Sequence, residues 1–125
     1  MRLNHLDLPV PDVAAARDFF ADWLGFTPVE TRGSDGLAIL RDTSGLVLVL
    51  SRLRRSGAQA MPEGFHIGFH LASEDEVTAL HRRLQGAGVG DIAPPSMQRG
   101  AFSFYFEGPG AILVEVASRP PPVGS

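Results

Sequence analysis

The sequence predicts an α+β fold built from two repeated β-α-β-β-β modules, whose curled mixed sheet surrounds a cleft. The first observation is a strand pattern: residues 65–72 alternate apolar and non-apolar side chains, and residues 4–10 do the same 61 positions earlier. The second is that, at the same offset, a helix-capping residue and a later glycine follow each strand. These matched pairs are Asp12 with Ser73 and Gly25 with Gly86. A recurrent strand, cap and helix end indicate a duplicated supersecondary unit.

The two opening strands predict which side chains leave the core. Successive strand residues point to opposite faces, so an apolar face and a polar face separate in each segment. In residues 65–72 the apolar face is Phe65, Ile67, Phe69 and Leu71. The opposite face carries His66 and His70, and in residues 4–10 it carries His5 and Asp7. We therefore expect these histidines to face the cleft.

Each opening strand leads into a predicted helix. Asp12 is a good N-cap for a helix that ends at Gly25, with Phe19, Phe20 and Trp23 among its core residues. Ser73 and Glu76 have the spacing of a capping box for a second helix, which ends at Gly86 or Gly88. We expect that helix to bury its apolar stripe, which comprises Val77, Leu80 and Leu84. His81 lies in its last turn and is predicted to be on the surface.

Short strands joined by tight turns complete each module. In the first module they are expected at residues 27–32, 37–41 and 46–52. In the second, residues 91–100 contain Pro94 and Pro95 and predict at best a short edge strand, followed by strands at 102–106 and 111–117. The prediction is one domain over residues 1–125, with modules at 1–53 and 64–118, a connector at 54–63 and a flexible tail at 119–125.

Composition restricts the chemistry and the partners. The 125 residues contain no cysteine and no lysine, so thiolate metal sites, thiol nucleophiles and Schiff-base lysines are excluded. A net charge of -3 without a basic stripe argues against nucleic acid, and no apolar run is long enough for a membrane span. Without a signal-peptide pattern, a cytoplasmic location is expected.

Three side chains from separate strands suggest a metal site. Glu115 is the only charge in the last strand and lies opposite the apolar face formed by Ile112, Val114 and Val116. A buried lone carboxylate is costly unless it meets a cation, a donor or a metal. With His5 and His66 it would make three ligands of one ion, which leaves positions open for water or substrate as catalytic sites require. His70 lies roughly 13 Å along the strand from His66 and is expected at the rim.

These segments together resemble the vicinal oxygen chelate superfamily, which includes glyoxalase I, extradiol dioxygenases, fosfomycin-resistance thiol transferases, methylmalonyl-CoA epimerase and bleomycin-binding proteins. The resemblance covers nearly the whole chain and is carried by residues 3–6, 19–26, 65–67 and 104–110 followed by Glu115. It implies a glyoxalase-like fold, one divalent metal (Fe, Mn, Zn or Ni) held by His5, His66 and Glu115, and a homodimer. It also implies that Ser103 and Tyr105 face a small-molecule substrate. In an enzyme of this kind, Tyr105 or Asp7 would handle a proton.

The branch within the superfamily stays open. Aligning residues 42–45 with 107–110 puts Leu50 at the position of Glu115, and leucine cannot supply the fourth ligand of glyoxalase I. Asp7 and the absence of lysine disfavour the fosfomycin branch. Met97, Gln98 and Arg99 stand where an extradiol enzyme has a histidine. The further candidates for substrate contact are His70, Leu50 and Arg99.

Two functions of different class remain. The first is a divalent-metal-dependent enzyme, of dioxygenase, lyase or transferase type, that acts on a small oxygen-chelating substrate with the metal as Lewis acid or oxygen-activating centre. The second is a metal-free dimeric binding protein that sequesters an aromatic antibiotic or metabolite, as bleomycin-resistance relatives do.

Overall fold

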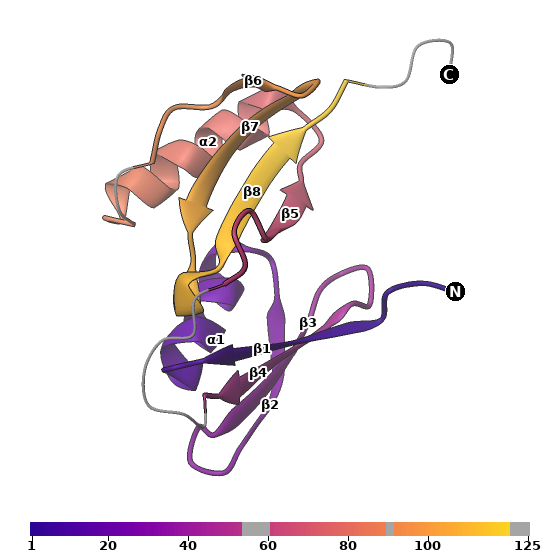
Figure 1. Cartoon of the computed structure of the whole chain (residues 1–125), viewed down its shortest axis with the longest axis vertical. Helices are drawn as coiled ribbons and strands as arrows, with labels where there is room; N and C mark the ends of the chain where they lie inside the picture. The colour runs from indigo at the N-terminus through magenta and orange to yellow at the C-terminus, as the bar shows by residue number, and fades with distance from the viewer. Residues whose placement is uncertain (54–60, 90–91, 121–125) are drawn as a thin grey trace. The chain divides into compact units, whose positions relative to one another are not determined.

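The computed structural model describes residues 1–53, 61–89 and 92–120 and shows two compact units, Met1–Ala60 and Met61–Ser125. Each unit contains one helix and one four-stranded mixed sheet, so the predicted α+β fold of two β-α-β-β-β modules is confirmed (Figure 1). Most of the predicted connector and of the predicted tail lies outside the described residues. In the described part, no helix is long and apolar enough to cross a membrane.

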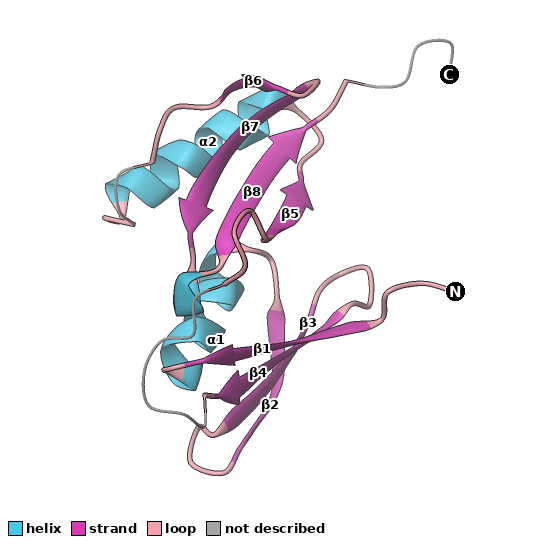
Figure 2. Cartoon of the chain, viewed as in Figure 1, coloured by secondary structure: helices cyan, strands magenta, loops and turns pink. Residues whose placement is uncertain are grey.

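The elements of the first unit follow the predicted order (Figure 2). They are β1 (His5–Val10), α1 (Val13–Trp23), β2 (Thr27–Arg32), β3 (Leu37–Arg41) and β4 (Val47–Arg52). The strand order in the sheet is β1-β4-β3-β2, in which β1 and β4 are parallel and the other neighbours antiparallel. Helix α1 packs against β3 and β4, so one face of this sheet is free of its helix.

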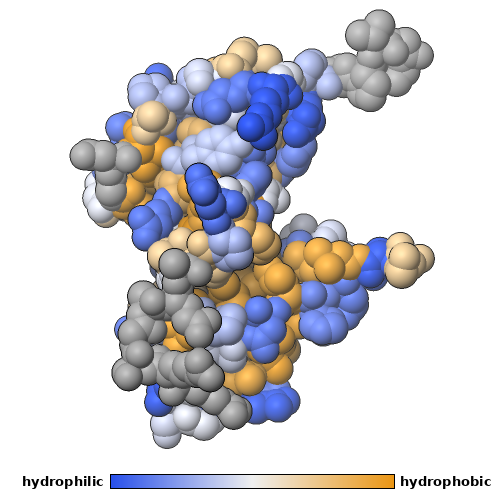
Figure 3. All heavy atoms as spheres, in the orientation of Figure 1, coloured by the Kyte–Doolittle hydropathy of each residue, from blue (hydrophilic) through white to orange (hydrophobic). Residues whose placement is uncertain are grey.

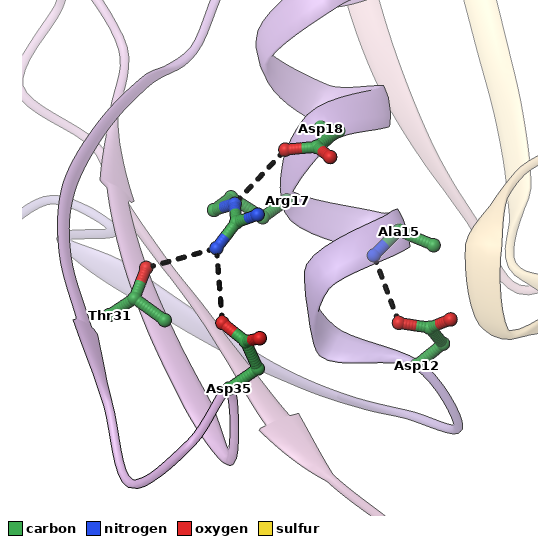
Figure 4. Close-up of polar contacts among 6 residues, drawn as sticks. All are labelled: Asp12, Ala15, Arg17, Asp18, Thr31 and Asp35. Atoms are coloured by element: carbon green, nitrogen blue, oxygen red, sulfur yellow. Dashed lines mark hydrogen bonds and ion pairs between the residues drawn. The ribbon is translucent and has the colours of Figure 1, made fainter.

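Local chemistry explains where α1 begins and how it is held. Asp12 has extended backbone, and its Oδ1 accepts from the backbone N–H of Ala15 at 3.0 Å, as an N-cap does (Figure 4). Arg17 then reaches across to the sheet side: its guanidinium donates to Thr31 on β2 and to Asp35 in the following turn, both at 3.3 Å (Figure 4). Phe20 is fully buried, whereas Trp23 and Phe19 are only half-buried.

The second unit repeats the arrangement with a longer helix and a shorter edge strand. Its elements are β5 (His66–His70), α2 (Glu74–Gly86), β6 (Ser96–Gln98), β7 (Ala101–Glu107), a 3₁₀ turn (Pro109–Ala111) and β8 (Leu113–Ser118). The strand order is β5-β8-β7-β6, with β5 and β8 parallel. Helix α2 lies along β7 and β8 (Figure 1).

The predicted cap of α2 is confirmed. The Ser73 hydroxyl accepts from the N–H of Glu76 at 3.2 Å, and the Glu76 carboxylate accepts from the N–H of Ala72 at 2.8 Å. Gly88, with φ +75°, follows the C-cap residue of α2, Ala87. In the same way Gly25, with φ +76°, follows the C-cap residue of α1, Leu24. Gly88 is therefore the counterpart of Gly25, and the predicted match with Gly86 is wrong by two residues because α2 is longer.

The prediction for His81 is wrong. Its side chain is 5% exposed, its Nε2 donates to the carbonyl of Ile92 at 3.1 Å, and its ring meets the ring of Phe104 on β7 with centroids 5.2 Å apart. Val77 and Leu84 are also fully buried, whereas Leu80 is half-buried. The buried stripe of α2 thus runs through Val77, His81 and Leu84, because residues four and three apart share one helix face.

Two predicted strand ends also differ from the structure. Phe65 precedes β5 and is 46% exposed, so it is not a core residue. Ala111 belongs to the 3₁₀ turn with φ +62°, so β8 begins at Leu113 rather than at residue 111. On β7, Phe104 packs against α2 and Tyr105 lies on the opposite face, so Ser103 and Tyr105 leave the strand on the side away from the helix.

Candidate functional site

The helix-free face of the second unit gathers most of the predicted site residues. Strand pairing places three rows across it: His66 beside Leu113, Gly68 beside Glu115 and Tyr105, and His70 beside Ala117 and Ser103. Because directly paired residues share a face, these side chains all leave the sheet on the side away from α2. Glu115 occupies the middle row on the central strand β8.

Glu115 is held between a phenol and an imidazole. Tyr105 donates its hydroxyl to Glu115 Oε2, and His66 Nε2 lies 3.7 Å from the same oxygen. The rings of His66 and Tyr105 meet edge to face with centroids 5.6 Å apart. The Glu115 side chain is only 14% exposed, while that of His66 is 36% exposed. The carboxylate that the sequence left without a partner therefore has both a donor and an imidazole beside it.

The contact with Glu115 changes the pKa of Tyr105. Its hydrogen bond to Glu115 raises the pKa of Tyr105 above the usual value, and partial burial and the negative charge of Glu115 act in the same direction. The positive charges of Arg99 and Arg119 oppose that shift in the pKa of Tyr105. Tyr105 is thus held protonated as a hydrogen-bond donor at neutral pH.

The remaining candidates of this unit lie around the same face. Ser103 is almost wholly buried, and His70 is exposed at the far row, four residues along β5 from His66. Arg99 forms the two-residue turn between β6 and β7 together with Gly100, with φ +51° and +77°, as a type I′ hairpin requires. Sequence patterns gave no sign that a non-glycine residue adopts this backbone conformation.

In the first unit, His5 and Asp7 lie on the face that α1 leaves free. Their strand partners on β4 are Val47 and Val49. His5 Nδ1 lies 3.3 Å from Asn4 Oδ1, and the Ser51 hydroxyl donates to Asp7 Oδ1 at 2.6 Å. Asp7 is therefore a hydrogen-bonded carboxylate. The sequence alone did not identify Ser51 as its partner.

The prediction for Leu50 is wrong. Gly68 pairs with Glu115 on β8, and its counterpart Asp7 pairs with Val49 on β4, so Val49 occupies the position of Glu115. Leu50 lies one residue further, on the side of the sheet that faces α1, and is fully buried between Leu8 and Ala38. It does not lie on the face of His5 and Asp7. Valine is as unable as leucine to bind a metal, so the argument against a fourth protein ligand is unchanged.

The donor set of the second unit fits a divalent ion. Two atoms that each lie about 2.0 to 2.2 Å from one ion can be at most about 4.4 Å apart, so the 3.7 Å between His66 Nε2 and Glu115 Oε2 is compatible with a shared ion. Neutral imidazole nitrogen and carboxylate oxygen suit first-row divalent metals. Among residues 1–53, 61–89 and 92–120, no three histidine or acidic side chains form a metal-sized group, and the third predicted ligand, His5, belongs to the first unit.

Known structures are similar to this chain over almost its whole length. A possible glyoxalase from Bacillus cereus is 37% identical, with 94% of this chain and 98% of that one covered and a TM-score of 0.83. A glyoxalase/bleomycin resistance protein/dioxygenase from Nocardioides is 24% identical, with 99% and 90% covered and a TM-score of 0.72. A genomically encoded fosfomycin resistance protein from Listeria monocytogenes is 20% identical, with 96% and 94% covered and a TM-score of 0.76.

The family itself follows from the sequence match. Curated protein sequences give no significant match. The family model of the Glyoxalase/Bleomycin resistance protein/Dioxygenase superfamily, however, matches residues 2–116, which include both helices and almost all of both sheets. The glyoxalase-like fold that the resemblance implied is confirmed, and the chain belongs to the Glyoxalase/Bleomycin resistance protein/Dioxygenase superfamily.

Proposed function

We propose that this protein is a divalent-metal-dependent enzyme that acts on a small substrate through two of the substrate's oxygen atoms. The observation that carries the proposal is the pair formed by His66 Nε2 and Glu115 Oε2, 3.7 Å apart on the helix-free face of the second sheet. His5 is the proposed third ligand because it stands at the position of His66 in the internal repeat. When bound, the ion would supply Lewis-acid polarisation or oxygen activation at the substrate.

The residues around the ligands have separate proposed roles. Tyr105 holds a proton at its Oη, close to Glu115, and is the proposed donor to a substrate oxygen. Asp7, fixed by the Ser51 hydroxyl, is the proposed proton acceptor in the first unit. Ser103, His70 and Arg99 are proposed to contact substrate, since they lie on or at the edge of the face that carries Glu115.

One observation favours the second candidate, a metal-free dimeric protein that sequesters an aromatic antibiotic or metabolite. The helix-free face of the first unit carries four half-buried apolar side chains, namely Leu37, Ile39, Val47 and Val49. In the view of Figure 3, hydrophobic residues occupy much of the visible surface of that unit. Such a surface suits an aromatic ligand without any metal.

Metal binding separates the two candidates. The protein should be purified without chelators or a metal-affinity tag, its metal content determined, and Fe(II), Mn(II), Zn(II) and Ni(II) titrated by calorimetry. His66→Ala and Glu115→Gln should each weaken binding at least about tenfold, because the first removes a ligand and the second replaces an anionic carboxylate with a neutral, weaker amide oxygen. His70→Ala is the matched control, a histidine on the same strand and face that should leave the affinity unchanged. A parent protein that binds none of these ions at micromolar concentration would favour the binding protein.

Assembly and location complete the proposal. We propose a homodimer, because each sheet has two edge strands that a second copy could cover: β1 and β2 in the first, β5 and β6 in the second. Light scattering that gives only the monomer mass at micromolar concentration would contradict it. The complete absence of cysteine is in keeping with a reducing compartment, and the proposed location is the cytoplasm.

A further inference from the structure

A tight turn immediately precedes the strand that carries His66. The carbonyl of Pro62 accepts from the N–H of Phe65 at 3.1 Å, and Gly64 has φ +78°. The preceding residue, Glu63, does not have a positive φ. A left-handed residue at the third position alone defines a type II turn, for which glycine is the usual choice and asparagine the next.

The turn places the carbonyl of Gly64 next to the side chain of His66. Gly64 O lies 2.9 Å from His66 Nδ1. A carbonyl oxygen can only accept, so Nδ1 carries the proton of the neutral ring and Nε2 carries the lone pair. That lone pair is on the nitrogen 3.7 Å from Glu115 Oε2. The backbone of Gly64 therefore determines which nitrogen of His66 can bind an ion beside Glu115.

The first unit shows the same relation by a different means. His5 Nδ1 also lies against an oxygen supplied by a residue just before it, Asn4 Oδ1 at 3.3 Å. A side-chain amide serves there where a backbone carbonyl serves at His66. In both units the nitrogen left for a ligand is Nε2.

We infer that Gly64 is a positioning residue: its left-handed turn holds His66 in the Nδ1–H tautomer and so presents Nε2 next to Glu115. The consequence for metal binding rests on the proposed function, but the tautomer is a property of the metal-free protein. An experiment can therefore refute the tautomer of His66 without refuting the proposed function, and the reverse.

Two substitutions isolate the backbone conformation from sterics. A Cβ added at Gly64 would meet no atom within 4 Å, so a side chain has room there. Gly64→Asn keeps a residue that tolerates positive φ, whereas Gly64→Val introduces a β-branched residue for which that conformation is an outlier. The two variants differ mainly in whether the turn, and with it the carbonyl, can stay in place.

The first readout is the tautomer of His66 in metal-free, ¹⁵N-labelled protein, observed by long-range ¹H–¹⁵N correlation above the pH range in which histidine ordinarily titrates. The chain has four histidines, so the signal is assigned from the spectrum of His66→Ala. We expect Nδ1–H in the parent and in Gly64→Asn, and a rise in Nε2–H in Gly64→Val. Nε2–H in the parent, or an unchanged tautomer in a folded Gly64→Val, overturns the inference.

The second readout is Zn²⁺ affinity by calorimetry. Gly64→Val should bind about 10- to 100-fold more weakly than the parent and Gly64→Asn within about threefold, the usual range when an outer partner of a ligand is lost. Parent-like affinity in Gly64→Val despite a shifted tautomer overturns the role of Gly64 in ligation. If the parent binds no Zn²⁺, the titration is repeated with Fe(II), Mn(II) and Ni(II). Binding of none of the four ions refutes the proposed function, while the tautomer data still decide the positioning of His66. If Gly64→Val does not fold, Gly64→Ala replaces it in both measurements.

Discussion

The contact between Tyr105 and Glu115 can be tested without knowing the substrate. Tyr105 is the only tyrosine of the chain, so the near-ultraviolet absorbance of tyrosinate reports this residue alone. Its phenol donates to Glu115, and that hydrogen bond is the main reason why the pKa of Tyr105 is raised above 10.0. Glu115→Gln keeps the size of the side chain and removes its negative charge. We expect this substitution to lower the pKa of Tyr105.

The size of the effect on stability follows from the burial of the acceptor. A hydrogen bond to a charged group contributes about 1.5 to 3 kcal/mol, and more of that is lost when the acceptor is shielded from water. The Glu115 side chain is 14% exposed, so water replaces the missing phenol only in part. Tyr105→Phe should therefore lower the free energy of unfolding by about 1.5 to 3 kcal/mol at neutral pH.

The dependence on pH has a definite sign. Because the pKa of Tyr105 is higher in the folded than in the unfolded chain, the folded state binds more protons once the pH exceeds the unfolded value near 10. The stabilisation is fully present below that pH and is lost as the pH rises through the raised pKa of the folded state. Tyr105→Phe should show no such component in its unfolding free energy.

The test is to measure the pKa of Tyr105 by spectrophotometric titration in the parent, in Glu115→Gln and in Glu107→Gln. Glu107 is the matched control, since it lies on the same strand and face as Tyr105 but pairs with Leu113 rather than with Glu115. A parent pKa at or below 10, or equal values in the parent and Glu115→Gln, would refute the assigned hydrogen bond and its effect.

Three further substitutions test the fold by urea unfolding. Ser73→Ala removes the N-cap of α2 and should cost about 1 kcal/mol, and a loss below about 0.3 kcal/mol would contradict the capping interaction. Phe20→Ala empties a fully buried site and should cost about 3 to 5 kcal/mol, so a loss under about 1 kcal/mol would show that the first unit is not packed around it. Arg17→Met removes ion pairs to exposed Asp18 and Asp35 and should cost less than about 1 kcal/mol, whereas a larger loss would mean that Arg17 stabilises the unit by more than surface pairing.

The sequence predicted well those features that short-range rules control. Alternation placed the strands, and the spacing of Ser73 and Glu76 placed the start of α2, because both depend on neighbouring residues alone. Helix spacing also indicates the buried position of His81, because His81 is four residues from Val77 and three from Leu84 and so shares their face. The surface prediction rests instead on the place of His81 near the end of the helix, where a cation favours the helix dipole. The acceptor at Ile92 and the ring of Phe104, both outside α2, satisfy it in the interior.

The contacts of the candidate site were beyond short-range rules. Patterns predicted that His66 and Glu115 share a face, and strand pairing in the structure agrees. They did not predict that Tyr105 donates to Glu115, since that requires the exact register of β7 against β8. They also did not predict the partner of His66 Nδ1, which depends on the left-handed backbone of Gly64. Both contacts join residues through backbone geometry that composition does not encode.

The misplacement of Leu50 has a single backbone cause. The loops before β4 and β8 have equal length and the same closing hydrogen bond, from Asp42 N to Leu46 O and from Gly108 N to Ile112 O. Gly45, with φ +95°, therefore corresponds to Ala111, with φ +62°, and not to Gly110. Matching glycine to glycine shifted the alignment by one residue, because alanine gives no signal for left-handed backbone.

Correcting that shift changes what the two units offer to a ligand. In the row of the sheet where the second unit has Gly68, Glu115 and Tyr105, the first unit has Asp7, Val49 and Ile39. The acid thus sits on the central strand in one unit and on the edge strand in the other, where Ser51 holds it. The duplicated fold therefore keeps a histidine in both copies but places an acid beside it in two different ways. The second unit alone combines an imidazole, a carboxylate and a phenol in direct contact, and it is there that we expect substitutions to alter metal affinity most.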